Sequence, residues 1–260
     1  MPTRLVGILN LTPDSFSDGG SYTDLSSLLI SCTTLIKEGA AVIDIGAEST
    51  RPNAIPLSAK EEWQRLAPYL KSIINHIHQL GALASLDSRH PENVQRAVDL
   101  GIDWMNDVSG LSDQAMIDVA ASSHVSIVVM HSVSIPAERT MTIPDDIDPI
   151  LYLKQWLDTC ISHASAAGID KQRLIFDPGI GFGKNVDQCW SLINRADELK
   201  AFGYPLFIGH SRKGFLAPDK APKDRDPETC RVSAQLCRKQ VDYLRVHNVI
   251  SNKLACISLQ

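Results

Sequence analysis

The sequence lacks long hydrophobic runs and lacks an excess of basic residues. No segment reaches the ~18 consecutive apolar residues that a membrane-spanning helix requires. Among the 260 residues, 25 Lys and Arg stand against 30 Asp and Glu, for a net charge of −5. This balance provides no electrostatic footprint for nucleic acid. The composition therefore predicts a soluble protein whose partners are small molecules, with no nucleic acid and no membrane.

The cysteines form no C-x-x-C pair, and most of them lie in segments that read as helices. This spacing favours buried thiols over a disulfide or zinc framework. His76 and His78 are two residues apart in a helical stretch, so they point to different faces and are poor candidates for one metal site. The six cysteines are Cys32, Cys160, Cys189, Cys230, Cys237 and Cys256.

The chain length and composition predict a single domain over residues 1–260. With 44% hydrophobic and 21% charged residues, the chain can bury one large core, and α/β barrels often reach this size as single domains. Residues 1–10 contain an apolar run too short for a signal peptide, which indicates a cytoplasmic protein.

Eight short apolar runs alternate with longer helical segments, as is typical of βα units around a parallel sheet. The predicted strands are 5–9, 41–46, 82–86, 102–106, 126–130, 173–176, 205–209 and 242–246. The predicted helices are 25–38, 59–80, 91–100, 114–122, 149–167, 188–202 and 229–240. Eight units favour a closed (β/α)₈ TIM barrel over an open doubly wound sheet, whose first turn usually reads G-x-G-x-x-G. The first turn here is NLTPDSF.

Almost every predicted strand ends in a polar or charged residue. In a barrel, the carboxyl ends of the strands converge on one mouth, where active sites lie. Polar turns alone would explain a few of these residues, but not Asn106 and Arg245, which interrupt apolar runs. The strand-end residues are Asn10, Glu48, Asp87, Asn106 with Asp107, His131, Asp177, Ser211–Lys213, and Arg245 with His247.

The glycine-rich segment DPGIGFGK, residues 177–184, is not a Walker A phosphate loop. That motif requires glycine where Pro178 stands and Ser or Thr where Asn185 stands. Its glycines instead suit a backbone that passes close to a flat ligand, and Asp177 offers two acceptor oxygens to adjacent N–H donors.

Together with NLTPDSFSDGG (10–20) and SRK (211–213), this segment resembles the dihydropteroate synthases, the (β/α)₈-barrel enzymes of folate synthesis. The resemblance covers essentially the whole chain. It implies a transferase that joins 6-hydroxymethyl-7,8-dihydropterin pyrophosphate to p-aminobenzoate, giving 7,8-dihydropteroate and pyrophosphate. It also implies Mg²⁺ as cofactor, a homodimer, and sulfonamides as benzoate mimics.

The resemblance also implies a role for individual residues. Positions that hydrogen-bond the pterin are matched by Asp87, Asn106, Asp177 and Lys213, the stacking position by Arg245, and apolar walls by Met130 and Phe182. Benzoate contacts are matched by Phe16, Thr50 and Pro52, the magnesium-associated asparagine by Asn10, and groups around the pyrophosphate by Asp18, Arg51 and His247. Arg51 belongs to the benzoate loop as well. The expected catalytic set is Asp18, Asp87, Lys213, Arg245 and His247, whereas Arg212 is expected to form a structural salt bridge.

The sequence departs from the family pattern in several places. Ser88 stands where threonine is common, Gly214 where serine is common, and His210 precedes the SRK motif unusually. Lys239 and Gln240 replace a common Gly-Ala pair. The amino-terminal hairpin that many members use to cap the barrel bottom is missing, so we expect another segment, a partner, or a fused folate-pathway domain to shield that face.

Two rival functions stay open. A methyltransferase that uses methyltetrahydrofolate would share the barrel and the pterin-edge residues, but it would lack the STRP loop, the SRK lysine and the RVH histidine. A non-catalytic pterin-binding homologue would have no need of Asn10, Asp18 and Arg51. Dependence of pyrophosphate release on both substrates would separate an enzyme from a binder.

Overall fold

The computed structural model describes residues 2–11, 24–48, 56–135, 138 and 140–257. The predictions made for the two loops that follow the first and second strands lie outside the described residues. They concern Phe16, Asp18, Thr50, Arg51 and Pro52.

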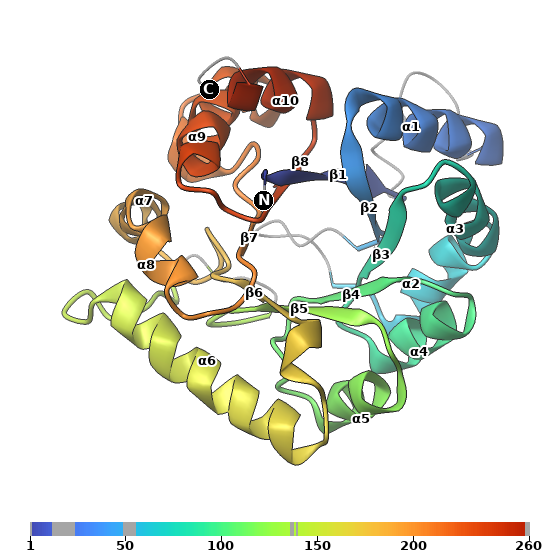
Figure 1. Ribbon diagram of the computed structural model, residues 1–260, viewed down its shortest axis with the longest axis horizontal. Helices are drawn as coiled ribbons and strands as arrows, with labels where there is room; N and C mark the ends of the chain where they lie inside the picture. The colour runs from blue at the N-terminus through green and yellow to red at the C-terminus, as the bar shows by residue number, and fades with distance from the viewer. Residues whose placement is uncertain (1, 12–23, 49–55, 136–137, 139, 258–260) are drawn as a thin grey trace.

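Eight strands run parallel to one another in the order β6-β5-β4-β3-β2-β1-β8-β7. A parallel bridge between Phe176 and Leu206 joins the two ends of this order, so the sheet closes into a barrel with helices around it (Figure 1). The predicted (β/α)₈ architecture is confirmed. The strands are β1 (Arg4–Asn10), β2 (Ala40–Gly46), β3 (Leu83–Asp87), β4 (Trp104–Asp107), β5 (Ser126–Met130), β6 (Leu174–Asp177), β7 (Phe207–Ile208) and β8 (Tyr243–Val246).

The helices begin and end largely where the sequence signals predict. Pro91 and Pro149 occupy first-turn positions, and Gly39 ends its helix in the left-handed conformation with φ 115°. The helices are α1 (Leu25–Glu38), α2 (Ala59–Leu66), α3 (Leu70–Gln79), α4 (Pro91–Asp99), α5 (Gln114–Ser122), α6 (Pro149–Ala166), α7 (Val186–Asn194), α8 (Ala196–Lys200), α9 (Asp226–Arg238) and α10 (Val249–Ile257).

Two predicted helices are each divided, and one helix was not predicted. The stretch 59–80 contains Pro68, which lacks a backbone N–H, and α2 ends just before it while α3 begins just after. The stretch 188–202 starts earlier, because Asn185 and Gln188 form a capping box, and it breaks at Arg195. Helix α10 was not predicted; only two residues separate its start from the end of β8, so no longer loop marks where it begins.

The interpretation that buried thiols are favoured over a disulfide is wrong for two of the cysteines. Cys237 at the end of α9 and Cys256 in α10 are bonded to each other, with 5.7 Å between their Cα atoms. The two residues are 19 positions apart, so spacing alone could not pair them. They meet because α9 and α10 pack side by side (Figure 1). The other four cysteines are free thiols, as expected.

An apolar plug fills the barrel interior. Seven of the strands contribute one buried residue each, and the rings of Trp104 and Tyr243 meet edge to face with 4.8 Å between centroids. Residues of the barrel itself thus occupy this part of the interior. The plug consists of Val6, Val42, Trp104, Val128, Ile175, Phe207 and Tyr243. Within the described residues, no helix has both the length and the apolar character needed to cross a membrane.

Candidate active site

The period of two along each strand places the predicted site directly above the apolar plug. Side chains at i and i+2 point to the same side of a strand. The plug residues Val42, Trp104 and Tyr243 are therefore followed, one layer nearer the carboxyl ends, by Asp44, Asn106 and Arg245. The same step leads from Val128 to Met130 and from Ile175 to Asp177. The polar interruptions in the apolar runs thus form one layer inside the mouth of the barrel.

Arg245 holds two carboxylates in this layer. Its Nε donates to Asp44 Oδ2 and its Nη2 donates to Asp87 Oδ2, both at 2.6 Å. Asp44 also accepts hydrogen bonds from Ser85 Oγ at 2.6 Å and from Asn106 Nδ2 at 3.0 Å. Asp44, with its side chain 1% exposed, is the buried anchor that orients the guanidinium of Arg245 and the amide of Asn106.

Two polar groups of the layer, Asn106 and Asp87, are not fully stabilised by their neighbours among the described residues. The Oδ1 atom of Asn106 is buried and has no hydrogen-bond partner among the described residues. Burial raises the pKa of Asp87 to about 7; the Arg245 charge opposes this shift and the charge of Asp44 adds to it. A buried acceptor without a donor is costly, so the layer suits a ligand that brings its own N–H groups.

Asp177 and Lys213 are a second set of opposite charges in this region, and each favours the charged form of the other. Asp177 Oδ1 accepts from Gly179 N at 2.7 Å, and burial raises the pKa of Asp177 to about 6 although the Lys213 ammonium favours the charged form. Burial likewise lowers the pKa of Lys213 to about 8. The Lys213 ammonium donates to Ile180 O and lies 4.4 Å from the centroid of the Phe182 ring. The pair therefore presents an acceptor and a donor beside an aromatic wall.

Gly179 explains why the segment after β6 is rich in glycine. Its φ is +65°, and a Cβ at this position would lie 1.8 Å from the carbonyl oxygen of His131. Only glycine lets the backbone turn here and aim its N–H at Asp177.

Asn10 ends β1, and its Oδ1 lies 3.7 Å from the position that a Cβ on Gly46 would take. An amide oxygen is a ligand that hard cations such as Mg²⁺ accept. Asp87 Oδ2 lies at the same distance from that position, but it already accepts a hydrogen bond from Arg245 Nη2 at 2.6 Å. Farther along the mouth, His247 Nδ1 lies 3.0 Å from Ser211 Oγ.

Comparisons with known proteins agree with this geometry. The model of the pterin-binding enzyme family matches residues 6–247. The dihydropteroate synthase of a Synechocystis species is 35% identical over 98% of this chain and 88% of its own length.

The chain belongs to the dihydropteroate synthase family.

Two further members of the family show its range. A probable bifunctional folylpolyglutamate synthase/dihydropteroate synthase of Halobacterium salinarum is 40% identical over 97% of this chain, which spans only 31% of that protein's length. A crystal structure of the Anaplasma phagocytophilum dihydropteroate synthase contains bound 6-hydroxymethylpterin-monophosphate. It superimposes with a TM-score of 0.89, at 34% identity, over 99% of this chain and all of that one.

Most residues that the resemblance to dihydropteroate synthases predicts for the pterin site lie together in the structure. Their individual roles stay predictions. Met130 is buried at the end of β5, and its Cγ lies 3.4 Å from the Cβ position of Gly179. Arg212 pairs with Asp226 through Nε at 2.7 Å and Nη2 at 2.8 Å, as expected of a structural salt bridge. The gathered residues are Asp87, Asn106, Met130, Asp177, Phe182, Lys213 and Arg245.

Sequence reasoning missed two polar residues of this dihydropteroate synthase site. Asp44 was passed over, although it is the one charged residue in the predicted strand 41–46 and carries the same signal as Asn106 and Arg245. Lys184 ends the segment DPGIGFGK, but no role was predicted for it. It is buried, its Nζ lies 2.8 Å from His131 Nδ1, and burial lowers its pKa to about 7.

Ser88 and His210, two residues that depart from the dihydropteroate synthase pattern, have hydrogen-bond partners in the structure. Ser88 Oγ donates to Glu62 Oε2 at 2.7 Å. His210 is fully buried, with Nε2 2.9 Å from Ser233 Oγ, and burial lowers its pKa to about 4. The imidazole is therefore neutral at physiological pH and fills a place in the packing of α9 against β7.

Proposed function

We propose that the chain is a transferase that condenses 6-hydroxymethyl-7,8-dihydropterin pyrophosphate with p-aminobenzoate, giving 7,8-dihydropteroate and pyrophosphate. The observation that carries the proposal is the polar layer above the apolar plug, in which Asp44, Asn106 and Asp177 are buried. It combines the unpartnered Asn106 Oδ1, the carboxylates of Asp87 and Asp177, the Lys213 ammonium and the Arg245 guanidinium. A flat heterocycle with N–H groups and acceptors around its rim satisfies such a set.

The chain's residues would act by positioning and by charge. Asn106 and Asp177 would accept hydrogen bonds from the pterin edge, while Lys213 donates to one of its acceptors. Arg245, held from below by Asp44, would present the face of its guanidinium for stacking. An aromatic amine is already neutral near pH 7, so the attack on the pterin methylene carbon needs no strong base to prepare the nucleophile.

Departure of pyrophosphate is the step that most needs charge stabilisation. Asn10 would hold Mg²⁺ together with phosphate oxygens of the substrate, and the ion when bound would neutralise charge on the leaving group. His247 would donate to the pyrophosphate, oriented by Ser211 Oγ at 3.0 Å. The carboxylate of Asp87 would oppose positive charge on the ring and methylene as the carbon–oxygen bond breaks.

Pyrophosphate release measured with each substrate alone and with both together tests the proposal. We expect fast release only when the chain, Mg²⁺, the pterin pyrophosphate and p-aminobenzoate are all present, with 7,8-dihydropteroate formed in equal amount. A non-catalytic pterin-binding homologue would release none above background. A methyltransferase would instead consume methyltetrahydrofolate without forming pyrophosphate.

Pterin binding should weaken as the pH falls below about 6. The pKa of Asp177 in the free protein is about 6, so below this pH the carboxyl is protonated and directs a donor at the N–H donors of the ligand. Affinity should then drop by up to about tenfold per pH unit. Calorimetric titration with 6-hydroxymethylpterin from pH 5 to pH 8 measures this. The Asp177→Asn variant cannot titrate here, so it should lose this step; a step of the same size in the variant would contradict the assignment.

The cellular setting belongs to the same proposal. The protein would act in the cytoplasm as a homodimer, and sulfonamides would compete with p-aminobenzoate. The double name of the Halobacterium relative supports the idea that a domain of this kind can be carried together with another folate-pathway domain. Sedimentation analysis of the purified chain would test the dimer.

A further inference from the structure

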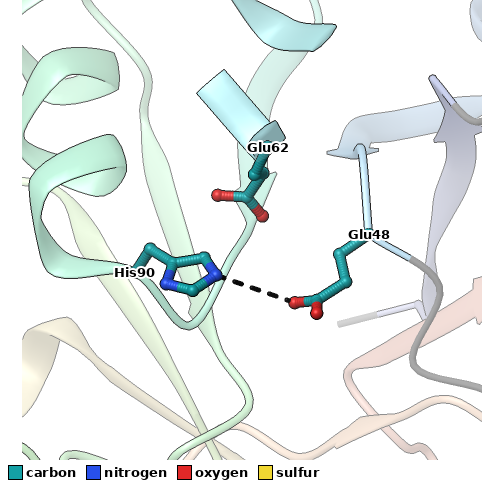
Figure 2. A group of neighbouring side chains, drawn as sticks. All are labelled: Glu48, Glu62 and His90. Carbon is teal, nitrogen blue, oxygen red and sulfur yellow. Dashed lines mark ion pairs between the residues drawn. The ribbon is translucent and has the colours of Figure 1, made fainter. Parts of the chain in front are cut away.

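Three potential metal ligands converge beside the predicted pterin site. Glu48 lies two residues after the end of β2, Glu62 lies in α2, and His90 is the residue before α4. One possible ligand atom from each side chain lies within 4.8 Å of the other two. Figure 2 shows the three side chains facing a common space. None of the residues of this cluster, Glu48–Glu62–His90, is the Asn10 proposed above to hold Mg²⁺.

Glu62 supplies an independent sign that the cluster takes a cation. The residue is 0% exposed. Its Oε2 accepts from Ser88 Oγ and from Asn93 Nδ2, both at 2.7 Å, but its Oε1 has no hydrogen-bond partner among the described residues. Figure 2 shows one oxygen of this carboxylate pointing toward the space between His90 and Glu48.

Glu48 keeps one acceptor position for a cation. Its Oε1 accepts from Leu57 N at 2.8 Å and from Arg89 Nη2 at 3.1 Å, which uses both lone pairs. Among the described residues, its Oε2 accepts only Arg89 Nε, at 2.9 Å, and it faces His90 Nε2 at 4.0 Å. Arg89 therefore neutralises Glu48 and orients it, whereas Glu62 has no ion-pair partner within the described ranges.

His90 can turn its Nε2 toward a cation without leaving a polar group unpaired. That nitrogen lies 3.1 Å from Leu57 O, which implies that it carries the proton in this arrangement. Leu57 O also accepts from Arg89 Nη2 at 3.0 Å. The carbonyl would keep this second donor if His90 moved its proton to Nδ1 and offered Nε2 as a ligand.

We propose that Glu48, Glu62 and His90 form a second divalent-cation site, one that prefers Zn²⁺ to Mg²⁺. Zn²⁺ accepts both imidazole nitrogen and carboxylate oxygen as ligands, whereas Mg²⁺ favours oxygen ligands and retained water, so the imidazole of His90 favours Zn²⁺. Donor distances of 2.0–2.2 Å in such sites place ligand atoms roughly 3.4 Å apart, so the cluster would contract by about 1 Å on binding.

The site would tie three segments of the barrel mouth together. The segment after β2, helix α2 and the start of α4 each supply one ligand, and Arg89 stands two residues after Asp87 of the predicted pterin site. Occupancy would therefore brace the mouth from the side without contributing a group to the pterin layer. The proposal does not depend on the transferase function, because it concerns residues outside that layer.

Crystals of the full chain soaked with Zn²⁺ in excess Mg²⁺ would locate the metal by anomalous diffraction at the zinc edge. We expect a peak between Glu48, Glu62 and His90. In solution, calorimetry should detect one Zn²⁺ that Mg²⁺ does not displace. The variants Glu62→Gln and His90→Gln should each weaken this binding by at least about tenfold, since even outer-shell changes cost 10–100-fold in metal affinity.

The surface variant His78→Gln is the matched control. His78 is 39% exposed and pairs with Asp103, away from the cluster, so its loss should leave Zn²⁺ binding unchanged. The proposal is overturned if the peak appears only at other places, such as Asn10 or the free cysteines, or if Glu62→Gln binds Zn²⁺ as tightly as the unmodified chain. Absence of Zn²⁺ binding together with a higher melting temperature for Glu62→Gln would identify a proton as the occupant, and would equally overturn it.

Discussion

The Asp177→Asn variant should bind a pterin about 100-fold or more weakly than the unmodified chain. An amide offers one acceptor atom where the carboxylate offers two, and it points an N–H group at the donors of the ligand. It also removes the negative charge that most favours the charged form of Lys213. Hydrogen bonds to charged groups are worth ~1.5–3 kcal/mol each, and each 1.4 kcal/mol changes affinity about tenfold. Calorimetric titration with 6-hydroxymethylpterin at pH 7.5 measures the loss.

A matched control for this variant is Asp158→Asn. Asp158 is 57% exposed in α6, and within the described part of the chain its ion-pair partner is Lys154, one turn before it, so the same chemical change there should leave pterin affinity unaltered. Equal affinity for Asp177→Asn and the unmodified chain would remove Asp177 from the pterin edge. Circular dichroism of both variants would show whether the barrel has stayed folded.

The Arg245→Met variant should lose about 3–5 kcal/mol of unfolding free energy. Removing one partner of a buried ion pair leaves an uncompensated charge, which is among the most costly single changes. Here two carboxylates lose their cation at once, because Asp44 and Asp87 both receive hydrogen bonds of 2.6 Å from the guanidinium. Urea denaturation at pH 7.5, with a constant slope against denaturant, measures the change.

The pair Arg212–Asp226 provides the comparison for Arg245. The two arginine side chains are similarly exposed, 24% for Arg212 and 21% for Arg245, but Asp226 is 22% exposed whereas Asp44 is 1% and Asp87 is 10% exposed. Arg212→Met should therefore cost only about 1 kcal/mol. Adding Asp44→Asn to Arg245→Met should restore part of the lost stability, because the charge left without a partner is then removed. A loss below about 1 kcal/mol for Arg245→Met alone would show that water reaches these carboxylates and that they are not a buried pair.

Most of the fold could be predicted from the sequence because the signals that define its strands and helices are local. All eight apolar runs became strands, since each is short, apolar and bounded by glycine or polar residues. Residues 126–130 matched their strand at both ends, and residues 25–38 matched their helix. The predicted helix boundaries were wrong at Pro68, which interrupts a helix, and at Asn185, which caps one; both signals are local, but the helical periodicity of the surrounding residues masked them.

The residues of the candidate site could be predicted where they stand at the carboxyl ends of strands. Asn106 and Asp177 stand at carboxyl ends of strands, and a barrel brings those ends together whatever the rest of the chain does. The pairing of Arg245 with Asp44 was a different matter, because 201 residues separate them. It depends on the closure that sets β8 next to β1 and thereby brings Arg245 toward β2. The disulfide between Cys237 and Cys256 likewise depends on how α9 meets α10.

The sequence by itself determined the βα alternation, the barrel class and the family of the protein. These depend on periodicity and on motifs that are contiguous in the chain. Only the tertiary structure decided which charges meet, which polar atoms are left without partners, and which thiols are bonded. The importance of three groups depends on their burial and on neighbours far away in the chain: Asp44, Asn106 Oδ1 and Glu62 Oε1. Burial and long-range contact are properties of the closed barrel, because no local segment excludes water by itself.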